Sequence, residues 1–392
     1  MKANKLLSGE GKNIPLFKVF MPRTVIEPLT KVLFSGYIGE GPVAEEFEHK
    51  LAPWFSNSNV LTLCNGTVAL QLALRLANVG FGDEVISTPM TCSATNEPIV
   101  IAGAKIIWAD INPWTANIDP QDVARKITPK TKAILCVHWG GYPCDLDELN
   151  AIANEHGIAL IEDACHALGS TYHDKPIGSH SDFAAFSFQA IKLMTTIDGG
   201  ALVCKSKTDF ERGRLLRWYG IDRKAERKDL RCEADILEYG YKFHMNDVTA
   251  TIGIEQLKYL SNTIQKTRSN AVKYDMAFRN LKTVRLLKYN EDRLSAYWLY
   301  TIRVKDRSMF MDHMESKGIT VSQVHVRNDG FTMFKDYKVS LPGVDEFTSE
   351  QVSIPVGWWL TEKEVEHIID AVLEYGRIIN VMTVKNPIGG KH

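Results

Sequence analysis

The sequence predicts an α/β fold, in which a large domain with a mostly parallel, doubly wound sheet precedes a smaller C-terminal α+β domain. The chain has 392 residues, more than one small hydrophobic core would need. Between residues 59 and 205, near-continuous apolar runs alternate with helical patterns, which is typical of parallel strands buried on both faces. From 245 to 284 the pattern is helical, so we expect a long helix to join the two domains.

The apolar runs of the large domain are each expected to form a strand, and helical stretches lie between them. Residues 66–79 and 145–157 are two such helices. In the second, Asp145 is the expected N-cap with Glu148 three residues later, and Gly157 is the expected stop. The expected strands are 59–63, 84–88, 105–110, 132–139, 158–163, 183–188 and 200–204.

The C-terminal part mixes strand and helix patterns after the long helix. We place the boundary within that helix, which gives a large domain at 1–265 and a small domain at 266–392, with the N-terminal segment free to pack on the small domain. The small-domain elements are expected at 296–304 (strand), 308–318 (helix) and 361–379 (helix).

The composition is that of an ordinary globular protein. The net charge of −1 gives the molecule as a whole no electrostatic reason to bind nucleic acid or an anionic membrane, although it does not exclude local patches. No apolar stretch approaches the length of a membrane span, and the first residues lack the apolar segment of a signal peptide. The 7 cysteines show neither a CxxC pair nor metal-ligand spacing, so we expect no metal site and a reducing, cytoplasmic setting.

Ligands of parallel sheets collect beyond the carboxyl ends of the strands, so the loops after the strands are the candidate sites. In "CNGTVAL", Gly66 and Thr67 open a helix directly after a strand. The free N–H groups and positive end of such a helix can hold an anion such as phosphate. The alternative is a plain strand-to-helix turn.

In "IALIEDACHALG", Asp163 ends an apolar strand and His166 follows. A carboxylate in that position needs a cationic or strongly donating partner, and the protonated ring nitrogen of a cofactor would serve. The alternatives are a helix N-cap for Asp163 and an ordinary structural histidine for His166.

In "FSFQAIKLMTTIDGG", Ser187 ends a strand and Lys192 follows on a loop that leads to a glycine pair. A lysine beside apolar walls has a depressed pKa and becomes a nucleophile toward carbonyl groups, while Ser187 could donate to an anion. The alternative is a solvated surface lysine. Lys242, in "YGYKFHMND", lies just before the long helix, where a surface charge is the alternative.

Taken in order, these motifs resemble those of fold type I pyridoxal phosphate (PLP) enzymes, and specifically the DegT/DnrJ/EryC1/StrS family of sugar aminotransferases. The resemblance covers nearly the whole chain. It begins at "SGYIGEGPVAEEFE" and continues through "NGTVAL", "GDEVISTPMT", "VHWGGYPCDLDEL", "EDACHALGS" and "GYKFHMNDVTATIGIEQL" to "SIPVGWWLTEKEVEHI".

The resemblance implies a role for each motif residue. Lys192 matches the lysine that forms a Schiff base with PLP, Asp163 the carboxylate paired with the pyridine nitrogen, and His166 the residue that touches the phenolic oxygen. The phosphate ligands implied are Gly66, Thr67 and Ser187.

The chain departs from the family pattern at two positions near the cofactor. The family forms a homodimer with shared active sites, in which an asparagine of the "GYN" segment reaches the neighbour's phosphate; that residue is Lys242 here, and it could bind phosphate as a point charge. The aromatic residue that commonly stacks on the cofactor ring is Cys92 here, within "PMTCSAT". Another residue is therefore expected to cover that face of the ring.

The implied reaction is a ping-pong transfer of an amino group from L-glutamate to a keto sugar, either nucleotide-linked or a free sugar acid such as an 8-keto-octulosonate, for surface polysaccharide synthesis. One alternative is the family's dehydratase branch, whose members carry histidine where this chain has Lys192. A more remote alternative is a PLP-binding protein with no turnover.

Substrate choice is expected to depend on the segments "SGYIGEG", "VHVRNDGF" and "VGWWL". Tyr37 lies in the first and His325, Arg327 and Asn328 lie in the second. These side chains suit an anionic or polyhydroxylated substrate. An ion-pair network at a domain boundary is the alternative for the second segment.

Overall fold

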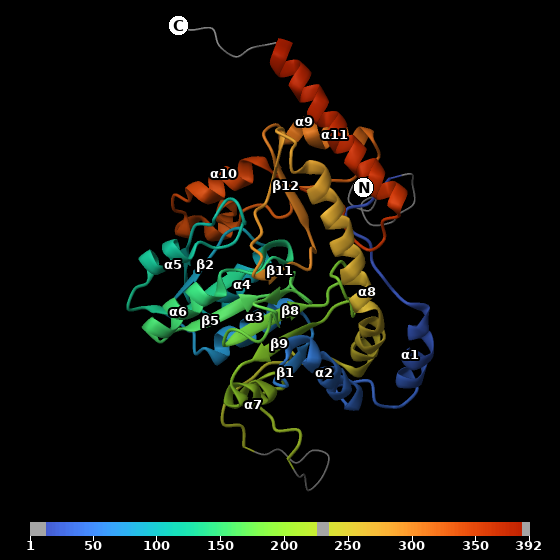
Figure 1. The fold of residues 1–392 in the computed structure, drawn as a ribbon. Helices are drawn as coiled ribbons and strands as arrows, with labels where there is room; N and C mark the ends of the chain where they lie inside the picture. The colour runs from blue at the N-terminus through green and yellow to red at the C-terminus, as the bar shows by residue number, and fades with distance from the viewer. Residues whose placement is uncertain (1–12, 226–234, 386–392) are drawn as a thin grey trace.

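The computed structural model describes residues 13–225 and 235–385. Its centre is a seven-stranded sheet with the strand order β1-β9-β8-β5-β4-β2-β3 (Figure 1). Each apolar run expected in the large domain forms one of these strands. They are β1 (Val60–Leu63), β2 (Glu84–Ser87), β3 (Lys105–Trp108), β4 (Thr131–Val137), β5 (Ala159–Asp163), β8 (Phe183–Ser187) and β9 (Gly200–Cys204).

The sheet is mostly parallel, as expected. Strand β9 runs antiparallel to both of its neighbours, β1 and β8, and the other pairings of the sheet are parallel. Gly200, the first residue of β9, therefore lies between Leu63, the last residue of β1, and Ser187, the last residue of β8. Asp163 ends the next strand, β5. The candidate site residues thus meet at one edge of the sheet.

Helices cover both faces of the sheet because successive side chains of a strand point to opposite faces. On β1, Leu61 packs in a cluster that includes helices α3 and α4, whereas Val60 packs on the other face with Phe47 and Phe55 of α2. The helices of this domain are α1 (Ile26–Leu33), α2 (Pro42–Phe55), α3 (Gly66–Leu76), α4 (Ser93–Ile101), α5 (Pro120–Lys126), α6 (Leu146–His156) and α7 (Lys207–Leu216).

The ends of helix α6 test the expected capping signals. Gly157 ends the helix in the left-handed conformation, with φ of 62°, as a stop residue should. Asp145 stands at the N-cap position, but its side chain makes no capping hydrogen bond. It pairs instead with the Arg293 guanidinium at 2.7 Å, so this part of the expectation was wrong.

The long helix α8 (Asp247–Phe278) connects the two parts of the chain, and Figure 1 shows it running from the side of the sheet to the C-terminal elements. Leu260 and Ile264 pack in a large-domain cluster, whereas Ala271 and Tyr274 pack in the C-terminal one. The helix thus contributes to the hydrophobic clusters of both parts of the chain, and the boundary at residue 265 stays a prediction.

The C-terminal part contains a small antiparallel sheet, β10-β12-β13, covered by helices. Ile14 of the N-terminal segment bridges Ile319 and belongs to the same hydrophobic cluster. The elements are β10 (Val284–Leu286), β12 (Tyr300–Val304), β13 (Gln351–Ile354), α9 (Arg307–Ser316), α10 (Pro342–Glu350) and α11 (Glu362–Lys385). A second small sheet contains β11 (Arg293–Leu294), β6 (Thr171–Tyr172) and β7 (Lys175–Pro176), and short 3₁₀ turns lie at Arg23–Val25, Trp139–Gly141, Asn328–Gly330 and Thr332–Tyr337.

Two features are absent from the part of the chain that the structure describes. None of the helices there combines the length and the apolar character that crossing a membrane requires. Nor do histidine, cysteine, aspartate and glutamate side chains gather anywhere in 13–225 or 235–385 in a group that could hold a metal ion.

Candidate functional site

The amine of Lys192 lies against an aromatic ring. Lys192 follows β8 on a loop, and its Nζ atom is 3.9 Å from the centroid of the Trp298 ring. The indole N–H of Trp298 donates a hydrogen bond of 2.9 Å to the carbonyl oxygen of Ile191. Lys192 is therefore not the freely solvated surface lysine of the alternative interpretation.

Asp163 is buried and held in place by hydrogen bonds to both carboxylate oxygens. Its Oδ2 atom accepts from the Thr95 hydroxyl of α4 at 2.6 Å, and its Oδ1 atom accepts from the Cys165 backbone N–H at 3.1 Å. Residues 164–170, which follow it, contain no helix, so the N-cap alternative for Asp163 was wrong.

Two histidines border the same cluster, and each has an unpaired ring nitrogen. The His166 ring stacks on Trp298 at 3.9 Å between centroids, and the His325 ring lies 5.5 Å from the His166 ring. The buried atoms Nδ1 of His166 and Nε2 of His325 have no hydrogen-bond partner. Because buried polar atoms are normally hydrogen-bonded, these two nitrogens mark a place where a ligand would be received.

The environment of the cluster shifts the pKa of each of its basic groups downward. Burial, together with the nearby Lys192 charge, lowers the pKa of His166 well below its usual value and the pKa of His325 to about 3. Burial also lowers the pKa of Lys192, and the charges of Cys165, Asp163 and Cys92 oppose that shift. A lowered pKa increases the fraction of neutral amine, which is the nucleophilic form.

The helix that was expected to bind an anion begins at the same edge. Gly66 is the first residue of α3, and Asn65 caps the helix by accepting from the Val68 N–H at 2.9 Å. A Cβ atom at Gly66 would lie 2.9 Å from both Cys165 Sγ and Ser187 Cβ. The start of α3 thus packs directly against the ends of β5 and β8, which is closer than a plain strand-to-helix turn requires.

The remaining residues expected around the cofactor lie nearby with fewer contacts. Thr67 is the second residue of α3, and Cys92 is exposed at the N-cap of α4. Lys242 is exposed on a loop whose next residue, Phe243, accepts a hydrogen bond of 2.7 Å from the Cys64 N–H. That loop therefore lies beside the end of β1.

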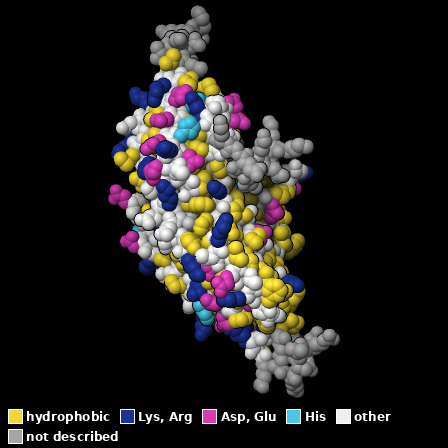
Figure 2. Space-filling model, turned by 90° about the vertical axis from the view of Figure 1, so that its right-hand side faces the viewer, with side chains coloured by type: hydrophobic (Ala, Val, Ile, Leu, Met, Phe, Trp, Pro, Cys, Tyr) yellow, Lys and Arg dark blue, Asp and Glu magenta, His cyan; other side chains and the backbone are white. Residues whose placement is uncertain are grey.

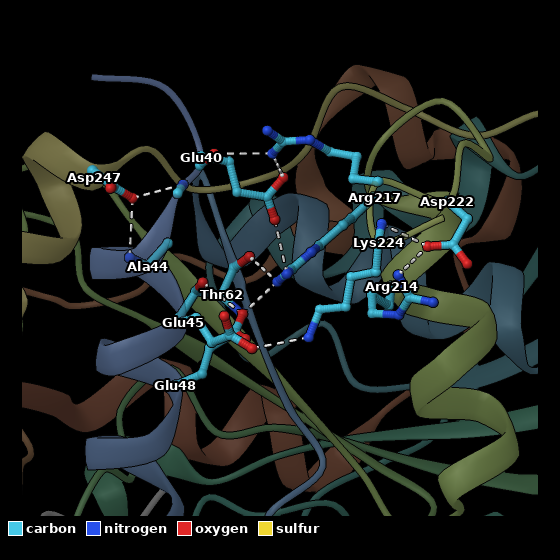
Figure 3. A network of polar contacts seen from close by, with 12 residues as sticks. Glu40, Ala44, Glu45, Glu48, Thr62, Arg214, Arg217, Asp222, Lys224 and Asp247 are labelled. Atoms are coloured by element: carbon cyan, nitrogen blue, oxygen red, sulfur yellow. Dashed lines mark hydrogen bonds and ion pairs between the residues drawn. The ribbon is translucent and has the colours of Figure 1, made fainter. Parts of the chain in front are cut away.

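Tyr37 lies in a different hollow from the Lys192 cluster. This hollow has a volume of about 650 Å³ and lies against α2, β1 and α7. Its centre is Arg217, which ion-pairs with Glu40 at 2.8 Å and with Glu48, and donates to the Thr62 carbonyl (Figure 3).

Further charged groups tie the segment that carries Tyr37 to the rest of the domain. The Asp247 carboxylate accepts from the backbone N–H groups of Gly41, Val43 and Ala44 at 2.8, 3.2 and 3.0 Å (Figure 3). Lys224 pairs with Glu45 at 2.9 Å. The hollow is thus built from ion pairs that satisfy one another and that fix the loop before α2.

The segment that contains His325 divides into residues with and without protein partners. Arg327 ion-pairs with Asp329 at 2.6 Å and with Asp345, which is the ion-pair alternative stated for this segment. The amide of Asn328 is fully buried, donates to the Thr91 carbonyl at 2.7 Å and accepts from Asn96 at 2.8 Å. Arg327 and Asn328 therefore have partners within the protein, and a substrate contact by either residue stays a prediction. His325 borders the cluster.

Sequence reasoning missed two residues of the site. Trp298 was read only as part of a strand pattern, although it contacts both His166 and Lys192. Thr95 was read as part of a motif and assigned no role, although it holds Asp163. The Thr91 hydroxyl, on the residue before the N-cap of α4, lies 2.6 Å from the Thr95 hydroxyl.

The donor set fits PLP. A lysine amine, a buried carboxylate and an unpaired imidazole nitrogen lie together at the sheet edge, and they would take the aldehyde, the pyridine nitrogen and the phenolic oxygen. Helix α3 begins at Gly66, where an added Cβ atom would lie too close to the Ser187 side chain. Its free N–H groups would take the phosphate.

Comparisons with known proteins agree with this chemistry. The spore coat polysaccharide biosynthesis protein SpsC of Bacillus subtilis (strain 168) is 30% identical over 361 residues, which cover 88% of this chain and 93% of SpsC. The sugar aminotransferase CalS13 from Micromonospora echinospora has 37% identity and a TM-score of 0.89, with 92% of this chain and 99% of CalS13 covered. Spr1654 from Streptococcus pneumoniae, solved in a PLP form, has 28% identity and a TM-score of 0.86, with 94% and 99% covered.

The family model described as the DegT/DnrJ/EryC1/StrS aminotransferase family matches residues 21–373. This match spans the sheet, the candidate site and most of the C-terminal part, and the two solved structures share the fold over 92% and 94% of this chain. The chain therefore belongs to the DegT/DnrJ/EryC1/StrS aminotransferase family and is a PLP-dependent sugar aminotransferase of fold type I.

Proposed function

We propose that the chain transfers an amino group from L-glutamate to a keto sugar, with PLP held on Lys192. The observation that carries this proposal is the position of the Lys192 amine. It is half-buried and lies 3.9 Å from the Trp298 ring. Burial lowers its pKa, the Asp163 charge opposes that shift, and burial also lowers the pKa of His166 and His325 nearby. Such an amine can act both as a nucleophile toward an aldehyde and as a base.

Each residue of the site would have a distinct task. When bound, PLP supplies an electron-accepting ring that makes the α-hydrogen of an amino acid acidic. The Lys192 Nζ atom would take that proton and return it to the neighbouring carbon. Asp163, fixed by Thr95, would keep the pyridine nitrogen protonated, and the Nδ1 atom of His166 would meet the phenolic oxygen.

We propose a homodimer in which Lys242 reaches the phosphate bound by the partner subunit, while Gly66, Thr67 and Ser187 bind it within their own subunit. The exposed Lys242 side chain supports this role. Helix α1 supports the dimer, because it has no buried residue and exposes Ile26, Leu33 and Phe34, which is 85% exposed. Figure 2 shows the face that carries α1 and α8, where hydrophobic side chains gather between more charged ends.

The substrate proposal rests on the chemistry of the Lys192 cluster and of the hollow that contains Tyr37. His325 borders the Lys192 cluster with an unpaired nitrogen, and Tyr37 is half-exposed on the loop before α2. Both can donate to hydroxyl or phosphate oxygens. Since SpsC is described as a polysaccharide biosynthesis protein, we propose that the aminated sugar, nucleotide-linked or a free sugar acid, enters a surface polysaccharide made from the cytoplasm.

The test is a pair of half-reactions with the purified protein. Adding L-glutamate to the PLP-loaded enzyme should convert the visible absorbance of the bound cofactor to that of its aminated form and release 2-oxoglutarate. A panel of keto sugars should then restore the original spectrum, with the aminated sugar identified by mass. Borohydride should fix the cofactor on Lys192, and Lys192→Ala should abolish both half-reactions.

The same experiment separates transamination from dehydration. A dehydratase would consume a sugar with loss of water and without amine transfer, and the dehydratase branch carries histidine where this chain has Lys192. Release of 2-oxoglutarate with no amino sugar formed from any keto sugar would contradict the proposed acceptor. Full turnover by Lys192→Ala would contradict the proposed mechanism.

A further inference from the structure

Trp298 is fixed between several elements of the protein. It is 6% exposed, and its ring stacks on Phe17 of the N-terminal segment at 5.2 Å and 20°. The ring also stacks on His166 at 3.9 Å and 23°. Its indole N–H donates a hydrogen bond of 2.9 Å to the Ile191 carbonyl oxygen. The ring therefore has little freedom to turn or withdraw.

The same ring is the direct contact of the Lys192 amine. At 3.9 Å from the ring centroid, Nζ is within the range in which an ammonium ion is attracted by an aromatic face, and tryptophan gives the strongest such attraction. The indole N–H bond ends on Ile191, the residue before Lys192, so the ring is tied to the loop that carries the amine. Within the described residues, no carboxylate forms an ion pair with Nζ and no hydrogen bond reaches it.

The other groups around Lys192 are less suited to hold its charge. Asp163 already accepts hydrogen bonds on both oxygens, from Thr95 and from Cys165. The two imidazoles, His166 and His325, repel the charge of Lys192 if they are protonated and are kept neutral by burial. Cys92 and Cys165 are the remaining titratable groups whose charge acts on the amine.

We propose that Trp298 is a positioning residue of the transamination, whose ring face holds the Lys192 ammonium whenever the lysine is not bonded to the cofactor. This inference rests on the proposed role of Lys192. During each half-reaction the freed amine must take up a proton at Nζ and release it again within the site. A fixed aromatic face keeps the protonated amine beside the reacting atoms without pairing it to a carboxylate, which would hold the proton too firmly.

The test measures the free amine in the protein without PLP, so that it does not depend on turnover. Trp298→Leu keeps an apolar wall but removes the aromatic face, and Trp298→Phe keeps a weaker face. The rate at which trinitrobenzenesulfonate modifies Lys192 is followed against pH by mass spectrometry of the peptide that contains it. Trp114→Leu is the matched control, because Trp114 lies under another lysine amine, that of Lys288, at 4.4 Å.

The expected result follows from the loss of the ammonium contact. The pH midpoint for modification of Lys192 should fall by roughly 0.5 to 1 pH unit in Trp298→Leu and by less in Trp298→Phe, with no change in Trp114→Leu. Near neutral pH this corresponds to modification about 3 to 10 times faster.

Two outcomes would overturn the inference: an unchanged or raised midpoint in the folded Trp298→Leu protein, or an equal fall in the Trp114→Leu control. If Trp298→Leu does not fold, as judged by circular dichroism, the Trp298→Phe midpoint decides the question alone. A purely structural role for Trp298 would lower the melting temperature without moving the midpoint. Failure of the proposed function would appear separately, as a wild-type protein that borohydride does not link to PLP at Lys192.

Discussion

Replacing Gly200 with alanine should disturb both the fold and the anion site, because β9 runs directly beneath the turn that begins α3. An added Cβ atom would lie 2.6 Å from the carbonyl carbon and oxygen of Asn65 and 2.7 Å from the Gly66 nitrogen. These are backbone atoms, so no side chain can rotate to make room. This contact explains why a glycine follows the lysine loop at this position.

The size of the effect follows from these distances. Ordinary contacts with a Cβ atom begin at about 3.4 Å, so the turn must move by several tenths of an ångström. Overpacking of this kind costs about 1 to 3 kcal/mol of the free energy of unfolding, and we expect the upper part of that range because backbone must move. The same displacement misaligns the N–H groups at the start of α3, and the loss of one such hydrogen bond weakens phosphate binding about tenfold.

Gly80→Ala is the matched control, since nothing lies within 4 Å of a Cβ atom there and its φ is not positive. Urea unfolding of the two variants without PLP should show a loss of stability at Gly200 and little change at Gly80. Titration with PLP, followed by absorbance, should show weaker binding only at Gly200. Equal unfolding midpoints for the two variants would refute the reasoning.

Three further variants test other parts of the structure. Asp247→Ala leaves the N–H groups of Gly41, Val43 and Ala44 at the start of α2 without their acceptor. It should lower the free energy of unfolding by about 2 to 4 kcal/mol in urea titrations. A loss below about 1 kcal/mol would contradict the role of Asp247 as the acceptor that caps α2. Burial lowers the pKa of His325 from 6.5 to about 3 in the folded chain. Between these pH values the unfolded chain binds one proton more than the folded chain. The free energy of unfolding should therefore fall as pH falls from 6.5 toward 3, by at most about 1.4 kcal/mol per pH unit. His325→Gln should flatten this slope between pH 7 and pH 5, and an unchanged slope would count against the buried neutral imidazole. Ile197 is 58% exposed and has a φ of 76°, a backbone conformation that costs a β-branched residue about 1 to 2 kcal/mol. Ile197→Gly should therefore raise the urea midpoint of unfolding. A lower midpoint would show that the contacts of the side chain outweigh the backbone strain.

The sheet could be predicted from the sequence because its signal is local. Most of its strands are buried on both faces and therefore form short apolar runs, as in Ala159–Asp163, where four of the five residues are buried. The residues that end these strands, such as Asp163 and Ser187, could be assigned to one edge because parallel strands end together. The positions of these residues at the ends of apolar runs were sufficient to predict that they lie at the same edge of the sheet.

The contacts that depend on distant residues could not be predicted. Asp145 has the residue type and spacing of a helix cap, but its carboxylate pairs with the guanidinium of Arg293, a residue distant in the sequence. Trp298 stands 107 residues from the Ile191 carbonyl that fixes it, in a stretch that reads as a strand. Neither pairing has a periodic pattern that would reveal it.

The sheet and the C-terminal part of the chain share one hydrophobic core beside the site, and this has a consequence for substrate recognition. The cluster that contains Leu61 and Leu202 of the sheet also contains Trp298, Leu299 and Phe347 of the C-terminal part. Because a continuous apolar contact resists relative movement of two domains, the wall formed by Trp298 should stay fixed when a sugar binds. Accommodation of different acceptors would then fall to segments outside this core, and we propose the loop of Tyr37, which ion pairs and hydrogen bonds around Arg217 and Asp247 hold in a separate hollow. Variants of that loop should change the Michaelis constant for the sugar while the half-reaction with L-glutamate keeps its rate.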